Sequence, residues 1–112
     1  MYEIRNYHND PKKFEVYKEW AIDHAVPILK ENLDIVGFWI DNGLAPELTG
    51  AAPDPNKHGS ANVTWIIRWE SKAARDQGHK TVFRGDGWKQ VWAKHPDANG
   101  YLQMEAKFAD EL

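Results

Sequence analysis

The sequence predicts an α+β domain in which a strand, a helix, two strands, a second helix and a last strand follow one another. Three observations support this fold class. Apolar residues recur at helical spacing after Phe14, four segments show the apolar run or alternation typical of strands, and turn residues separate these segments. A chain of 112 residues is the usual length of one domain, so we expect a single domain over residues 1–112.

The first strand is predicted over Tyr2 to His8, where apolar and charged residues alternate. Asp10 then suits the N-cap of a helix, and Pro11 suits its first turn because its missing N–H would have no partner there. The buried face of this helix should carry positions 14, 17, 21, 24, 25 and 28. Pro27 lies inside this pattern, and we expect it to kink the helix.

Residues 35–40 are apolar at nearly every position, so this second strand should be covered on both faces. The segment 43–61 is rich in proline and glycine and has no periodicity, which predicts a long loop. A third strand is predicted over residues 62–70, with Trp65 and Trp69 on one face and Thr64 and Ile66 on the other.

Ser71 is an expected N-cap for a helix over residues 72–83. Glycines then interrupt the helical pattern, a short helix is predicted over residues 88–95, and a last strand over residues 101–108. The resulting order is the split β-α-β-β-α-β arrangement of the ferredoxin-like fold, with a four-stranded antiparallel sheet.

Two helices can cover only one face of this sheet. The other face is expected to carry Trp39, Trp65 and Trp69, which are too apolar to remain in water. A second copy of the chain is the simplest cover. We therefore expect a homodimer, a dimeric α+β barrel, with a cavity between the two sheets.

Several short motifs, taken together in order and spacing, resemble the NIPSNAP family of dimeric α+β barrel proteins. They are Tyr-Glu-Ile-Arg-Asn-Tyr at 2–7, Trp20, His-Ala-Val-Pro-Ile-Leu at 24–29, Val-Gly-Phe-Trp at 36–39, Trp-Glu-Ser at 69–71, Ala-Ala-Arg at 73–75, and Trp88. The resemblance implies the ferredoxin-like protomer and the two-sheet barrel. The chain departs from the family at Trp65 and Ile67, where the family's third strand tends to carry His and Trp, and its 43–61 loop is longer than the usual connection.

Composition excludes several classes of function. The net charge is -3 and the basic residues are scattered, so we expect no nucleic-acid partner. There is no cysteine, which fits a reducing cytoplasm, and no apolar run is long enough for a bilayer, so we expect a soluble cytoplasmic protein without a membrane partner. His58, His79 and His95 lack the spacing of metal ligands, so no metal site is expected.

Candidate functional residues come from the predicted lumen and from the first helix. If Ile4 faces the helices, Glu3, Arg5 and Tyr7 line the barrel, either as the polar part of a pocket or as an internal ion pair. His24 lies near Pro27, where it would be a general base, a haem ligand or a packed core histidine. His8 lies at a strand end, and it too would be either a functional histidine or a packed one.

Two functions fit these features. In the first, the barrel binds a small aromatic or apolar compound and converts it without a cofactor, as in the monooxygenases and isomerases of the wider barrel group. Arg5 would then hold a carboxylate or oxyanion, Tyr7 or His24 would move the proton, and Trp39, Trp65 and Trp69 would form the walls. In the second, the dimer is a non-catalytic module that binds a ligand or a protein, with loop 43–61 as the contact element. Fold analogy alone does not choose between them.

Overall fold

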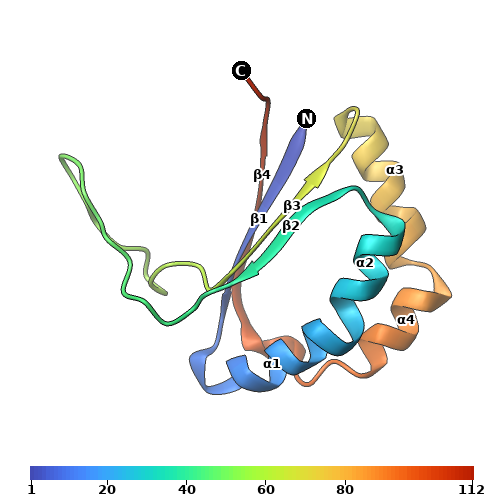
Figure 1. The fold of residues 1–112 in the computed structure, drawn as a ribbon, viewed down its shortest axis with the longest axis horizontal. Helices are drawn as coiled ribbons and strands as arrows, with labels where there is room; N and C mark the ends of the chain where they lie inside the picture. The colour runs from blue at the N-terminus through green and yellow to red at the C-terminus, as the bar shows by residue number, and fades with distance from the viewer.

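The computed structural model describes residues 1–112 and contains the predicted succession of elements (Figure 1). The strands are β1 (Tyr2–Asn9), β2 (Ile35–Ile40), β3 (Val63–Arg68) and β4 (Tyr101–Ala109). The helices are α1 (Phe14–Trp20), α2 (Val26–Asn32), α3 (Lys72–Phe83) and α4 (Asp86–Ala93). Short 3-10 turns at Pro11–Lys13 and Ala98–Gly100 precede α1 and β4.

The four strands form one antiparallel sheet in the order β2-β3-β1-β4. This is the strand order of the ferredoxin-like fold, so the predicted fold class is confirmed for the protomer. The central strand β1 pairs with both β3 and β4, and the register sets Arg5 opposite Trp65 and Tyr7 opposite Met104. The centre of the sheet therefore carries the residues that matter for the candidate site.

The helical segment between β1 and β2 is continuous but changes its geometry once. Asp10 caps its first turn by accepting a hydrogen bond from the backbone N–H of Lys12, as predicted. A π-helical turn over Ala21–Ala25 then separates α1 from α2, and the N–H of Val26 donates to the carbonyl of Ala21. Pro27 lies at the start of α2. A wider turn before a proline relieves the clash of its ring with the preceding turn, so Pro27 is accommodated by a π-bulge.

The helices pack on one face of the sheet, and the core lies between these two layers (Figure 1). The fully buried residues of β3 are Val63 and Ile67, and Trp65 is 3% exposed. Tyr17, Trp20, Ala21, Ala25 and Leu29 cover them from the α1–α2 segment. Trp20 is thus a core residue, and its Nε1 donates to the carbonyl of Val91 at 2.9 Å.

The expectation that Trp65 and Trp69 lie on the uncovered face is wrong, and Ile4 does not face the helices. Glu3, Arg5 and Tyr7 point toward the helices, as do Trp65 and Trp69 on β3 and just after it, whereas Ile4 lies on the opposite face. Alternation along the strands correctly grouped these residues, but it carries no information about which face the helices cover. The uncovered face is therefore not rich in indoles, since Trp39 is the tryptophan that remains on it.

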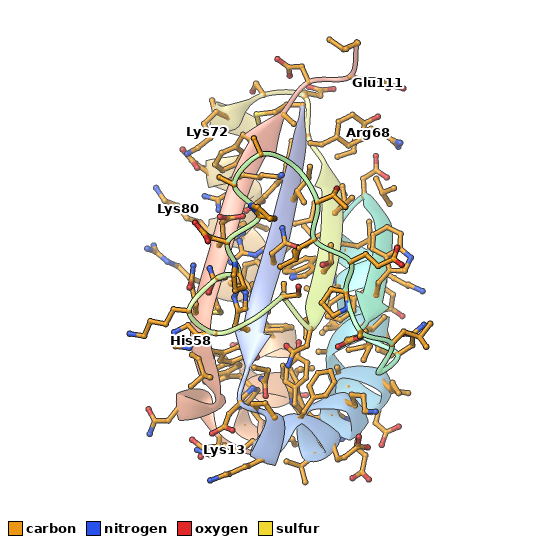
Figure 2. All side chains as sticks on the ribbon, turned by 90° about the vertical axis from the view of Figure 1, so that its left-hand side faces the viewer. Lys13, His58, Arg68, Lys72, Lys80 and Glu111 are labelled. Carbon is orange, nitrogen blue, oxygen red and sulfur yellow. The ribbon has the colours of Figure 1, made fainter.

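The long loop between β2 and β3 projects from the uncovered face of the sheet (Figures 1 and 2). It contains no helix or strand, and it approaches the sheet where His58 lies 6.1 Å from His8, measured between ring centroids. β2 is covered on one face only, because Val36 is 45% exposed and Trp39 is 49% exposed on the other. None of the helices combines the length and hydrophobicity needed to cross a membrane.

Candidate functional site

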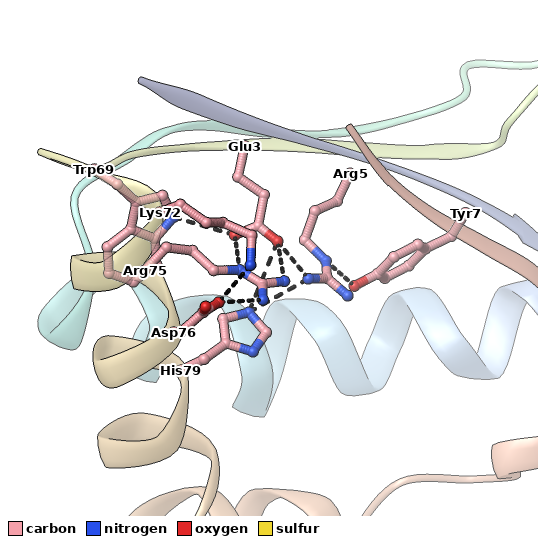
Figure 3. Close-up of polar contacts among 8 residues, drawn as sticks. All are labelled: Glu3, Arg5, Tyr7, Trp69, Lys72, Arg75, Asp76 and His79. Carbon is pink, nitrogen blue, oxygen red and sulfur yellow. Dashed lines mark hydrogen bonds and ion pairs between the residues drawn. The ribbon is translucent and has the colours of Figure 1, made fainter. Parts of the chain in front are cut away.

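A buried carboxylate organises the polar side of the site. Glu3 has no exposed surface, and its two carboxylate oxygens accept hydrogen bonds from three side chains (Figure 3). Arg75 on α3 donates from Nε to Oε1 at 3.1 Å and from Nη2 to Oε2 at 2.7 Å. Trp69 donates from Nε1 to Oε1 at 3.1 Å, and Arg5 donates from Nη1 to Oε2 at 2.7 Å. The carboxylate is therefore held by sheet, loop and helix together.

These contacts keep Glu3 ionised although it is buried. Burial by itself would raise the pKa of the carboxyl, but the hydrogen bond from Arg75 and the charges of Arg5 and Arg75 more than offset it, and the net pKa is lowered. A buried ion pair with this geometry links α3 to the sheet. Ser71 caps α3 through a hydrogen bond from the N–H of Ala74, as predicted, and so fixes the start of the helix that supplies Arg75.

Arg5 connects the buried carboxylate to Tyr7. Its Nε donates to the Tyr7 hydroxyl at 2.7 Å, and its guanidinium lies 5.3 Å from the centre of the Trp65 ring. Burial raises the pKa of Tyr7 against the opposing charge and hydrogen bond of Arg5, so the hydroxyl stays protonated at neutral pH. The Trp65 N–H is itself buried and reaches no acceptor within the protein.

His79 approaches the same cluster from α3. Its Nε2 lies 3.3 Å from Arg5 Nη1 and 3.8 Å from Glu3 Oε2. Burial and the charge of Arg75 lower the pKa of His79 to about 4. A guanidinium can only donate, so Nε2 is the acceptor and the proton of the neutral ring is on Nδ1. His79 is thus an uncharged partner of Arg5 and has no free lone pair for use as a base.

A cavity of about 220 Å³ lies between the sheet and the helices, next to this cluster. Fourteen residues line it, twelve of them hydrophobic, and the other two are Arg5 and His79. Aromatic rings form most of the wall: Tyr7, Tyr17, Trp20, Phe38, Trp65, Phe83, Trp88, Trp92 and Tyr101. The cavity therefore combines an aromatic body with one polar end, the arrangement typical of small-molecule sites.

Two lining residues mark where the cavity meets solvent. Trp92 on α4 is 41% exposed and Met104 on β4 is 53% exposed. Trp88 and Trp92 both form part of this cavity wall, and Trp88 also packs against the core.

The predicted site residues are only partly brought together. Arg5, Tyr7 and Trp65 line the cavity, while Glu3 bonds Arg5 and Trp69 bonds Glu3 outside the cavity wall. His24 is half-buried in the π-helical turn and does not line the cavity. Trp39 lies on the uncovered face of the sheet. His24 and Trp39 are therefore separated from Arg5 and Tyr7.

Two residues of the cluster, Arg75 and His79, are absent from the residues expected to form the site. They are four positions apart on α3, so both face the sheet from neighbouring turns of one side of the helix. A charged residue on the buried face of a strand needs a cationic partner from the covering layer. That spacing of Arg75 and His79 is the signal that could have identified them once Glu3 was placed beneath the helices.

Fold and cavity together define a ferredoxin-like α+β protein with an aromatic cavity beneath its helices. No protein-family model matches the sequence, and no curated protein sequence matches it. Solved structures do match. An uncharacterized NIPSNAP domain protein from Burkholderia xenovorans superposes with a TM-score of 0.72 at 13% identity, over 99% of this chain and 93% of that chain.

Two proteins from Agrobacterium tumefaciens are also similar. A NIPSNAP family protein has a TM-score of 0.69 at 13% identity, over 95% of this chain and 80% of its own. A NIPSNAP family protein with unknown function has a TM-score of 0.64 at 20% identity, over 95% of this chain and 82% of its own. At such identities the likeness establishes the fold, and at that level it confirms the resemblance to the NIPSNAP family predicted from the sequence.

Proposed function

We propose that this protein binds a small aromatic compound in the cavity between its sheet and its helices. The observation that supports this most directly is the cavity itself, whose hydrophobic wall ends at Arg5 and His79. An apolar cavity of roughly 150 Å³ is large enough for benzene. The present cavity of about 220 Å³ is therefore suited to a compound with one substituted ring.

The same residues limit the chemistry that such a site can perform. Tyr7 remains protonated and His79 is neutral with its Nε2 facing Arg5, so neither is a ready base at neutral pH. Arg5 and Tyr7 are instead hydrogen-bond donors that can polarise an oxygen atom of the ligand. Any conversion without a cofactor would thus begin with stabilisation of negative charge on that oxygen.

Binding can be tested by saturation-transfer NMR with single-ring aromatic compounds. We expect transfer to at least one of toluene, benzamide and benzoate. Ala25→Leu should weaken that binding at least tenfold, because Ala25 is 2% exposed and lines the cavity, so the larger side chain would occupy ligand space. Ala109→Leu is the matched control, since Ala109 is exposed at the end of β4. Absence of transfer to every compound would refute the proposal.

We further propose that the protein is a homodimer joined through the uncovered face of the sheet. Trp39 and Val36 are nearly half exposed on this face, where Ile4 and Ile66 are also incompletely covered, and the loop between β2 and β3 projects from the same side (Figure 2). A partly apolar surface of this kind with a projecting arm suits an isologous contact.

Sedimentation equilibrium tests the dimer. We expect a dimer mass for the wild-type protein and a weaker dimer for Trp39→Ser. Ile22→Ser is the control, because Ile22 is 66% exposed on the helical layer and lies away from the proposed contact. A monomer at all concentrations would exclude this assembly.

A further inference from the structure

We infer that the ligand of this cavity carries an anionic oxygen, as in an aromatic carboxylate or phenolate, and that Arg5 and Tyr7 bind this oxygen. The inference rests on the proposed binding function and specifies its ligand class. Two observations support it. The polar cluster around Glu3 has more positive than negative charges, and hydrogen-bond donors of Arg5 and Tyr7 at the polar end of the cavity have no acceptor in the protein.

The polar cluster contains one positive charge more than it can neutralise. Its carboxylates are Glu3 and Asp76, and its cations are Arg5, Arg75 and Lys72 (Figure 3). Arg75 binds Glu3 through two nitrogens, and Lys72 pairs with Asp76 at 2.7 Å. Arg5 shares Glu3 with Arg75, although its side chain is only 14% exposed. A buried excess charge is costly in isolation, and an anion in the cavity would offset it.

No other group near Arg5 supplies this missing negative charge. His79 is the remaining titratable group of the cluster, and its depressed pKa means that it is neutral at pH 7. Tyr7 is also uncharged, since burial raises its pKa. Arg5, the cation that lines the cavity, therefore shares its one counterion, Glu3, with Arg75.

Arg5 also has a hydrogen-bond donor that no protein group uses. Nε is used by the Tyr7 hydroxyl and Nη1 by Glu3 and His79, but Nη2 makes no hydrogen bond within the protein and is not enclosed by it. A guanidinium nitrogen of this kind forms charge-assisted hydrogen bonds to a carboxylate or phenolate. Glu3 and Tyr7 fix the plane of the guanidinium, so Nη2 is oriented before any ligand arrives.

Tyr7 contributes a second donor next to Arg5. Its oxygen accepts from Arg5 Nε, and its own hydroxyl proton has no acceptor within the protein. The N–H of Trp65 is unpaired nearby, which adds a partial positive charge at this end of the cavity. Arg5 Nη2 and the Tyr7 hydroxyl are thus two neighbouring donors without a protein acceptor, a pattern that favours a ligand oxygen anion over a ligand hydrogen-bond donor of the same shape.

The prediction can be tested with three probes of similar shape: benzoate, its neutral isostere benzamide, and toluene. Titration calorimetry should show benzoate binding about ten- to a hundredfold more tightly than benzamide, the range expected for a charge-assisted hydrogen bond. Tyr7→Phe should weaken benzoate binding about fivefold or more and leave toluene binding unchanged. Arg5→Met should abolish the preference for benzoate, and 4-nitrophenolate in place of benzoate distinguishes a phenolate site from a carboxylate site.

The outcomes separate this inference from the binding proposal. If toluene and benzamide bind as tightly as benzoate, and Tyr7→Phe changes none of them, the cavity binds aromatic compounds but the anion site is refuted. If no probe binds, the binding proposal fails as well. Should Arg5→Met not fold, Tyr7→Phe still decides the matter, because it removes one oxygen atom and leaves the ring in contact with Trp65 and Tyr101.

Discussion

Replacement of Glu3 by glutamine is the most informative test of how the site is held together. The amide is nearly isosteric with the carboxylate, so the packing around residue 3 should persist. The negative charge is lost, however, and Arg5 and Arg75 then remain close to each other with side chains only 14% and 18% exposed. One amide oxygen also cannot accept all the hydrogen bonds that two carboxylate oxygens accept now.

The expected cost follows from this geometry. Removing one member of a buried ion pair typically destabilises a protein by about 3–5 kcal/mol, because the remaining charge is left unpaired. Here two guanidiniums share the carboxylate, so we expect a value of about 4 kcal/mol. Total stabilities of single domains are about 5–15 kcal/mol, and Glu3→Gln should therefore remove a large part of the folding free energy.

Urea unfolding followed by tryptophan fluorescence measures this change, with all variants at one protein concentration. Glu15→Gln is the matched control, since Glu15 pairs with Lys18 on the surface and its side chain is 81% exposed. That control should change stability by less than about 0.5 kcal/mol. A loss below about 1 kcal/mol for Glu3→Gln would show that the buried cluster does not organise this end of the fold.

Three further predictions concern helix α3 and its contacts. The contribution of His79 to the free energy of unfolding should fall by about 2.5 kcal/mol as the pH drops from 6.5 to 4, because the unfolded residue binds a proton near pH 6.5 while the folded residue, with its pKa lowered to about 4, stays largely neutral until the lower end of this range. His79→Gln should lose that part of the pH dependence, and an unchanged slope would contradict the assignment. Gly78→Ala should destabilise by about 1–3 kcal/mol although alanine favours helices, since a Cβ at Gly78 would overlap Trp69 Cζ3 and displace the ring that bonds Glu3; urea unfolding would reveal a stabilised variant if that contact is unimportant. Ser71→Ala should cost about 1 kcal/mol through loss of the α3 cap, and Ser60→Ala in the loop should cost nothing measurable.

Local patterns were sufficient for the secondary structure. Asp10 and Ser71 lie where their caps were predicted, and residues 35–40 form β2 as expected. These features depend on neighbouring residues, whose chemistry is visible in the sequence. The order of the elements then restricts the topology to a few arrangements, which is why the ferredoxin-like sheet could be predicted.

Which face of the sheet the helices cover depends on contacts between distant residues, and the expectation that Trp65 and Trp69 lie on the uncovered face was wrong. Glu3 is buried because Arg75 and Trp69, more than sixty positions away, satisfy its carboxylate. The alternation of residues along β1 predicts that Glu3, Arg5 and Tyr7 share one face of the sheet. It does so whichever of the two faces the helices cover. A charged residue is more often exposed than buried, so the pattern favoured Ile4 as the core residue.

The location of the cavity could not be predicted for the same reason. Its wall combines residues from β1, β2, β3, β4 and all four helices, and its volume depends on how their side chains pack. The helix geometry around His24 and Pro27 is another feature that the sequence did not predict. The π-helical turn that accommodates Pro27 also fixes the direction of His24, and helical periodicity does not specify such a turn.

The most direct test of ligand binding beneath the helices is a crystal structure of the complex with 4-bromobenzoate. Anomalous scattering from bromine locates one end of the ligand without reference to the protein density. We predict a bromine peak among the aromatic residues of the cavity and the carboxylate within hydrogen-bond distance of Arg5 and Tyr7. A bromine peak on the uncovered face of the sheet, or a carboxylate directed away from Arg5, would contradict this account.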